Sequence, residues 1–144
     1  MAEYPHSFRT LIVWQKAQEL ALEVAQLVAG LPSEPVASVL GRQVIASAAS
    51  IGANVAEGYG RFAAGAYRNH LSIARGSACE TDGWLDLLHK AGYMDQKSES
   101  RLHGLCMEVV KLLTTRMIGL DKQRAGAQRI REEPYPYEFD GGLD

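Results

Sequence analysis

The segment SIGANVAEGYGR, from Ser50 to Arg61, combines three glycines with polar side chains at helical spacing. Glycine-rich loops can hold phosphate through their backbone N–H groups, but nucleotide-binding loops carry Gly-x-x-x-x-Gly-Lys-Ser/Thr or follow a strand. Gly58-Tyr59-Gly60 has neither that spacing nor a strand pattern before it. We therefore expect no nucleotide site here, and we expect Gly58 and Gly60 to end a helix.

The polar side chains of this segment continue a stripe that begins earlier in the chain. At about 100° per residue they share one face of a helix, and they are Gln43, Ser47, Ser50, Asn54, Glu57 and Arg61. An apolar stripe flanks them on one side, and a stripe of alanines and Gly60 flanks them on the other. Two interpretations remain open. The polar stripe faces solvent, or it forms a hydrogen-bonded seam at a subunit interface, together with Glu80.

The other reactive residue types lack catalytic or metal-binding spacing. The three histidines and two cysteines of the central region share no i, i+4 spacing of the kind that ligates zinc; they are His70, His89, His103, Cys79 and Cys106. Ser77 and Glu80 are typical of a helix cap or a buried hydrogen bond, with no histidine spaced to activate the serine. We expect no enzyme activity, no metal, no cofactor, and buried reduced thiols.

Basic residues suggest a surface for nucleic acid. Arg61, Arg68 and Arg75 recur every seven residues, and residues 111–131 carry six bases against one acid. The candidate phosphate contacts are Arg61, Arg68, Arg75, Lys111, Arg116, Lys122, Arg124, Arg129 and Arg131. Solvated arginines that bind nothing are the alternative. Residues 132–144 hold five acids and no base, so we expect this tail to lie over basic surface and to compete with phosphates.

Hydrophobic periodicity predicts four helices and no strand. The first carries Val13, Ala17 and Leu20 and stops at Gly30 and Pro32; the second opens near Ser33-Glu34-Pro35 and runs to about Gly60. The third starts after Gly65, and the fourth follows a reversal at Gly92. Four helices with short connections predict an all-α, up-down-up-down antiparallel bundle over residues 1–121. We expect residues 122–144 to form an extended or disordered tail.

Composition places the chain among soluble globular proteins. Its 144 residues suit one domain, with 47% hydrophobic and 22% charged residues. The N-terminus lacks a basic start followed by an apolar run, and the uncharged run from Val44 to Ala56 is too short to span a bilayer. We expect a cytoplasmic protein with no membrane partner.

Several motifs together resemble a known family. They are Phe8-Arg9-x-Leu11-x-Val13-Trp14-x-x-Ala17, Gln43, Ser50-Ile51-x-x-Asn54-x-Ala56-Glu57-Gly58-x-x-Arg61, Leu71-x-x-Ala74-x-Gly76-Ser77-x-x-Glu80 and Gly92-Tyr93. This pattern is similar to that of the four-helix-bundle family of 23S ribosomal RNA intervening-sequence proteins. The resemblance covers residues 8 to about 120 and implies a ring-shaped homopentamer. It extends to the accessory protein of diversity-generating retroelements, which binds nucleic acid and a reverse transcriptase.

Two hypotheses for function follow. In the first, the protein is a non-enzymatic homo-oligomeric assembly or adaptor protein that binds RNA or DNA weakly. In the second, it is a protein-binding scaffold with no nucleic-acid role. The second helix supports assembly in both, because apolar or small residues cover about three-quarters of its circumference, more than a four-helix monomer buries.

Overall fold

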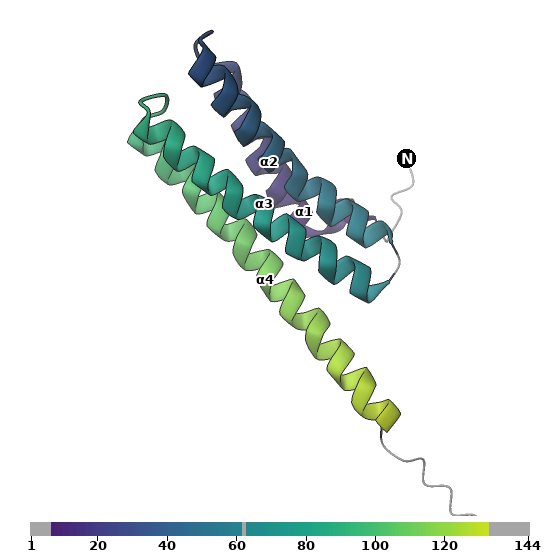
Figure 1. Ribbon diagram of the computed structural model, residues 1–144. Helices are drawn as coiled ribbons and strands as arrows, with labels where there is room; N and C mark the ends of the chain where they lie inside the picture. The colour runs from purple at the N-terminus through teal and green to yellow at the C-terminus, as the bar shows by residue number, and fades with distance from the viewer. Residues whose placement is uncertain (1–6, 62, 133–144) are drawn as a thin grey trace, which may run out of the picture.

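The computed structural model describes residues 7–61 and 63–132, with side chains as far as residue 127. A short 3-10 helix, η1 (Phe8–Thr10), precedes four α-helices. These are α1 (Ile12–Ala29), α2 (Pro35–Gly60), α3 (Ala64–Lys90) and α4 (Gln96–Glu132). The all-α prediction is therefore confirmed, and the described residues contain no strand (Figure 1).

The four helices form one antiparallel bundle in which sequence neighbours pack side by side and α4 returns to α1. Cross-helix contacts show the direction of each pair. Ser47 meets Thr81 whereas Asn54 meets His70, so α2 and α3 run in opposite directions. In the same way, Lys16 on α1 lies 3.6 Å from Glu108, and Glu23 pairs with Arg101 nearer the start of α4.

Local chemistry explains where the helices begin and end. Pro35 occupies the first turn of α2, where its missing N–H costs no hydrogen bond. Glu34 rather than Ser33 is the N-cap residue of α2, and it makes no side-chain capping bond. Gly92 has a φ of 86°, which only glycine adopts readily. Asp95 then accepts a hydrogen bond from the Ser98 backbone N–H over 2.7 Å, which caps the start of α4.

The core follows the predicted apolar stripes. In α1 the side chains of Val13, Ala17, Leu20 and Val24 are all buried. Leu20 and Ile51 meet Leu71, Leu85 and Leu113 from the other helices in one cluster, each fully buried. Burial of large apolar side chains from all four helices is what holds the bundle together, because each contributes about 1.5–3 kcal/mol on leaving water.

Helix α4 extends beyond the predicted boundary between bundle and tail at residue 121. Residues 122–132, which we expected to begin an extended tail, continue α4 as far as Glu132. Lys, Gln, Arg and Ala dominate this stretch and favour helix, and basic residues near a helix C-terminus are favourable. The described part of α4 ends at Glu132. The rest of the predicted tail, residues 133–144, lies outside the described residues.

Helix α2 is also the most apolar element. By length and composition alone it could cross a membrane, since an 18-residue window within it has a mean hydropathy of 1.3. The central helix of a water-soluble bundle meets the same criteria. Here α2 packs against both α1 and α3, and its fully buried side chains include Val44, Ile51 and Val55.

Candidate functional site

The centre of the polar stripe lies between α2 and α3 of the same chain. Ser47 is buried; it donates to the Val44 carbonyl over 3.0 Å and accepts from Thr81, whose hydroxyl oxygen lies 2.9 Å away. One turn further on, Ser50 Oγ lies 2.7 Å from Ser77 Oγ and donates to the Ser47 carbonyl. Each of these hydroxyl groups has a hydrogen-bond partner, either another hydroxyl or a backbone carbonyl. Burying them therefore avoids the free-energy penalty of an unpaired polar group.

A second group of polar side chains continues the contact toward the end of α2. Asn54 donates to the Ser50 carbonyl over 2.8 Å, and its Oδ1 lies 3.1 Å from Nδ1 of His70 on α3. The same His70 nitrogen lies 4.0 Å from Glu57, which accepts from Arg61 over 2.6 Å. Arg61 foremost, and His70 next, lower the pKa of Glu57. This series of polar contacts therefore begins at the half-buried amide of Asn54 and ends at the exposed Glu57–Arg61 ion pair.

The seven predicted seam residues therefore divide into two groups. Ser47, Ser50 and Asn54 join α2 to α3 within one chain. Gln43, Glu57, Arg61 and Glu80 are exposed, and Glu80 accepts from the Trp84 indole over 3.1 Å. Two further partners lie on α3, His70 and Thr81, which were not among the predicted residues. The signal was available, because His70, Ser77 and Thr81 are spaced by seven and four residues and so share one helix face.

Gly58 has a packing role that differs from the predicted one. It is buried inside α2, and a Cβ built on it would lie 2.5 Å from the His70 Cβ. Only glycine permits this approach of α2 to α3. Gly60 is the last residue of α2 and is exposed, with no atom within 4 Å of such a Cβ. The expectation of a helix end thus holds for Gly60 alone.

Among the described residues, no helix covers the stripe of small residues on α2. Ala46, Ala49, Ala53 and Gly60 are exposed, and Ala56 is half-buried. A groove of about 560 Å³ runs beside them between α1 and α2, with Trp14 and Leu22 among its lining residues. Leu22 is 61% exposed, although leucines usually lie in cores. This groove and the alanines form one continuous apolar surface, which we call the α1–α2 face.

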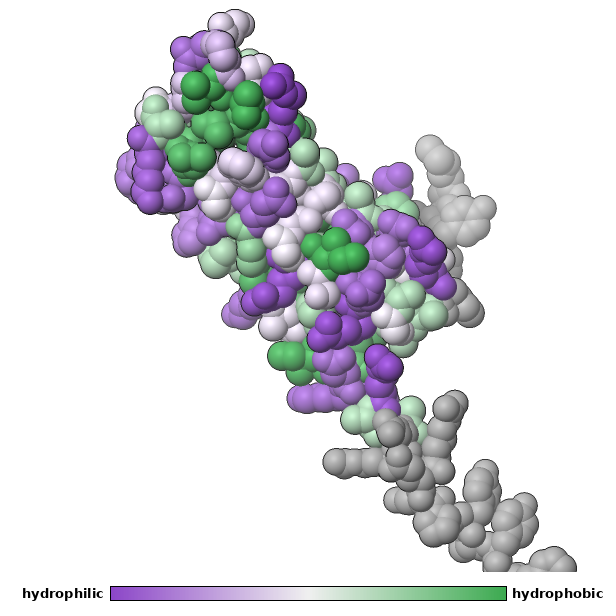
Figure 2. All heavy atoms as spheres, in the orientation of Figure 1, coloured by the Kyte–Doolittle hydropathy of each residue, from purple (hydrophilic) through white to green (hydrophobic). Residues whose placement is uncertain are grey.

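A second apolar surface lies at the end of the bundle that carries the α1–α2 and α3–α4 turns. Val36 and Val39 in the first turns of α2, and Leu87 near the end of α3, are exposed there. Figure 2 shows apolar side chains gathered at this end of the molecule. Exposed apolar side chains that cluster in this way usually mark a contact surface.

The predicted phosphate contacts differ in how free they are. Three of the arginines are engaged: Arg61 with Glu57, Arg68 with Asp121 over 3.1 Å, and Arg75 with the Thr114 hydroxyl over 3.0 Å. Arg116 lies above the ring of Tyr67. Lys111, Lys122 and Arg124 are exposed on α4. The side chains of Arg129 and Arg131 lie outside the described part, although their backbone belongs to α4.

The other reactive residues form no grouped site. Among the described residues, no three His, Cys, Asp or Glu side chains are placed to hold a metal ion. Both cysteines are free thiols, but only Cys106 is buried as expected; Cys79 is exposed. Burial raises the pKa of the Cys106 thiol to about 12, which keeps it protonated and unreactive. His103 pairs with Asp82 on the surface over 2.7 Å.

These features define an all-α four-helix bundle with a hydroxyl-rich α2–α3 contact and an uncovered face of small residues. Residues 9–115 match the 23S rRNA-intervening sequence protein family, and the chain belongs to that family. A crystal structure of a protein of unknown function from the S23 ribosomal protein family of Bacteroides thetaiotaomicron is similar, at 30% sequence identity and a TM-score of 0.70. The match covers 74% of this chain and 95% of that one. No protein with a curated description matches the chain.

Proposed function

We propose that this protein is a non-enzymatic, self-assembling adaptor whose α1–α2 face contacts a second copy of the chain, and which binds nucleic acid weakly. The observation that carries the proposal is the uncovered stripe of Ala46, Ala49 and Ala53 beside an apolar groove. Small side chains let two helices approach closely, and apolar surface left in water is a driving force for association. The resemblance to ring-forming relatives favours a homopentamer, and we propose that the protein acts in the cytoplasm.

The nucleic-acid part of the proposal rests on α4. Residues 122–132 carry four bases against one acid on a helix that runs about 18 Å beyond Leu120, at 1.5 Å per residue. The described side chains from Lys122 to Ala127 are all exposed, so this part of α4 packs on none of the other described helices. An exposed basic helix suits the phosphate backbone of RNA or DNA.

A purely protein-binding scaffold is the second candidate. It is favoured by the apolar surface of Val36, Val39 and Leu87, which lies at the opposite end of the bundle from the basic part of α4. It is favoured too by the engagement of Arg61, Arg68 and Arg75 with partners of their own chain.

Salt-dependent binding separates the two candidates. A fluorescein-labelled single-stranded RNA and a duplex DNA are titrated with the full-length protein at 50 mM and 200 mM salt. The adaptor proposal predicts binding that weakens as salt rises, because counterions are released from each neutralised phosphate. The double variant Lys122→Ala, Arg124→Ala removes two positive charges from α4 and should bind RNA and DNA more weakly than the wild-type protein. Lys90→Ala, which removes a positive charge at the other end of the bundle, should bind like the wild-type protein. No binding at 50 mM leaves the protein scaffold as the function.

A further inference from the structure

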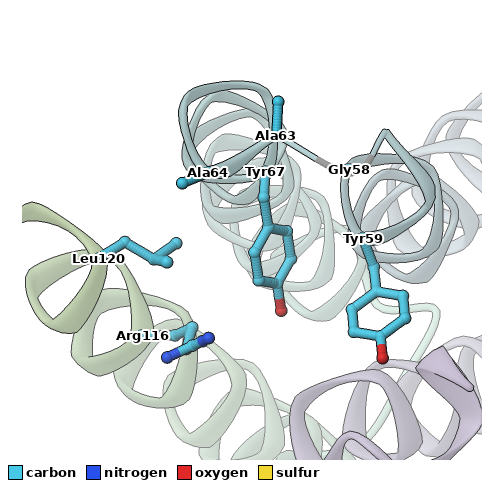
Figure 3. Close-up of a pocket in the computed structure, with 7 residues that line it drawn as sticks. All are labelled: Gly58, Tyr59, Ala63, Ala64, Tyr67, Arg116 and Leu120. Atoms are coloured by element: carbon cyan, nitrogen blue, oxygen red, sulfur yellow. The ribbon is translucent and has the colours of Figure 1, made fainter. Parts of the chain in front are cut away.

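A pocket of about 450 Å³ opens where α2 ends and α3 begins, and α4 closes its third side. Figure 3 shows two tyrosine rings and one guanidinium group directed into it from three helices. Its lining residues are Gly58, Tyr59, Ala63, Ala64, Tyr67, Arg116 and Leu120. Apart from the guanidinium and the two phenol groups, the side chains of this lining are small or apolar.

The phenol of Tyr67 is the unusual group in this pocket. The residue is 8% exposed, and its hydroxyl oxygen is buried without a hydrogen-bond partner among the described residues. Burial raises the pKa of Tyr67, and the Arg116 guanidinium acts in the opposite direction, although it lies outside hydrogen-bonding geometry. The Cζ atom of Arg116 lies 5.7 Å from the centroid of the Tyr67 ring. Buried hydroxyls are nearly always hydrogen-bonded. We therefore expect a bound group to accept a hydrogen bond from the Tyr67 phenol.

Arg116 is exposed at the rim of this pocket and can receive an anion from solvent. Among the side chains that the structure describes, no carboxylate forms an ion pair with it, whereas neighbouring Arg68 is paired with Asp121. A guanidinium, a donor-capable phenol and an apolar wall together fit a ligand with an aromatic or apolar body and an adjacent carboxylate.

We propose that this pocket binds the chain's own C-terminal segment, residues 133–144, with the ring of Phe139 inside it and the carboxylate of Glu138 or Asp140 on Arg116. The segment reads EPYPYEFDGGLD, so it supplies aromatic rings with acidic neighbours and no base. Its aromatic rings match the apolar wall of the pocket, and its carboxylates match the Arg116 guanidinium. Docking of the segment does not require that the protein bind nucleic acid.

The reach of the chain excludes Tyr135 and favours Phe139. Leu120 lines the pocket, and Glu132 lies about 18 Å further along α4. An extended chain covers about 3.3 Å per residue. Tyr135 can therefore return only about 10 Å from Glu132, and Tyr137 about 17 Å, which brings it level with Leu120 only at full extension. Phe139 can return about 23 Å, which takes it past Leu120 into the pocket.

Engineered disulfides test the proposed contact and its register. In a Cys79→Ser background, Ala64→Cys on the pocket rim is combined with Gly141→Cys, which keeps the Phe139 ring and its two acidic neighbours in place, and in a matched control with Tyr135→Cys. Mild oxidation should close the first pair within one chain, because docking brings the two Cα atoms within about 7 Å, and should leave the second pair open. Cross-links between chains, equal cross-linking of both pairs, or no cross-link in the first would each overturn docking on the chain's own pocket.

A peptide titration tests the chemistry of the same pocket. Protein truncated after Glu132 is titrated against a fluorescein-labelled peptide of residues 133–144, up to millimolar concentration, which is the range of effective concentration for a short tether. Arg116→Ala should weaken binding by about two- to fivefold, as expected for a partly exposed ion pair. Tyr67→Phe should also weaken it, while Lys111→Ala, at an exposed position of α4 outside the pocket, should not. No binding, or equal effects of Arg116→Ala and Lys111→Ala, contradicts the proposal.

Discussion

Gly58 sets the distance between α2 and α3 at the end of the polar contact. A methyl group in its place would collide with the His70 Cβ and lie 3.3 Å from the Tyr67 ring. Backbone and Cβ atoms cannot move aside as the tip of a long side chain can. The Asn54-x-x-Glu57-Gly58 part of the motif therefore combines a polar bridge to α3 with the close approach that makes the bridge possible.

We expect Gly58→Ala to destabilise the protein by about 1–3 kcal/mol, the usual cost of overpacking. The matched control is Gly76→Ala, in the middle of α3 with no atom within 4 Å of the added Cβ. That change should stabilise by about 0.5–1 kcal/mol, because alanine favours helix over glycine. Urea unfolding measures both. Equal effects from the two substitutions would remove the steric role of Gly58.

His103 and Asp82 give the surface a pH-dependent contact. The hydrogen bond to Asp82, and then its negative charge, raise the pKa of His103 above the usual 6.5. Stability from this pair is therefore present below pH 6.5 and is lost as pH rises through the raised pKa. The His103 side chain is 50% exposed, so the contribution is small. Asp82→Asn should lower the histidine pKa in an NMR titration and should destabilise more at pH 5.5 than at pH 8.5. A pKa unchanged by the substitution would contradict the pairing.

At the scale of elements, sequence patterns predicted the helices better than their contacts. The apolar stripe of Val13, Ala17 and Leu20 and the turn at Gly92 located the helices, because both signals are local. The polar stripe was harder, since periodicity places Ser47 and Asn54 on a face without saying which element covers that face. Their partners, Thr81 and His70, are more than 15 positions away in the sequence. The length of α4 was missed because basic residues were taken as a tail instead of as good helix formers.

The basic part of α4 and the acidic residues that follow it oppose each other in charge. Deleting residues 133–144 removes four acids and no base while leaving α4 complete to Glu132. We expect the deletion to raise affinity for RNA or DNA and to steepen its salt dependence, because more bases are then free to neutralise phosphates. Fluorescence anisotropy at several salt concentrations measures both quantities. Equal affinity and equal slope for the two proteins would show that the acidic segment does not compete with phosphate.

At the scale of the whole molecule, α2 is the element that a single bundle leaves incomplete. Its Val44 and Ile51 side is buried in the core, and its Ser47 side is occupied by α3. Among the described residues, no helix covers the side with Ala49 and Ala53, which borders the groove that Trp14 and Leu22 of α1 also line. Sequence periodicity predicted this excess of apolar surface from α2 alone. It could not predict the shape of the complete surface, on which the proposed assembly depends.

Native mass in solution, measured by light scattering at micromolar concentration, tests assembly through the α1–α2 face most directly. We expect about five times the 15.7 kDa chain mass for the wild-type protein. Ala53→Glu places a charge on that face and should give the monomer mass, because an unpaired carboxylate is costly to bury in an interface. Ala125→Glu, on the exposed part of α4, should leave the wild-type mass unchanged. A wild-type mass of 15.7 kDa, or an Ala53→Glu variant that assembles like wild type, would contradict the account.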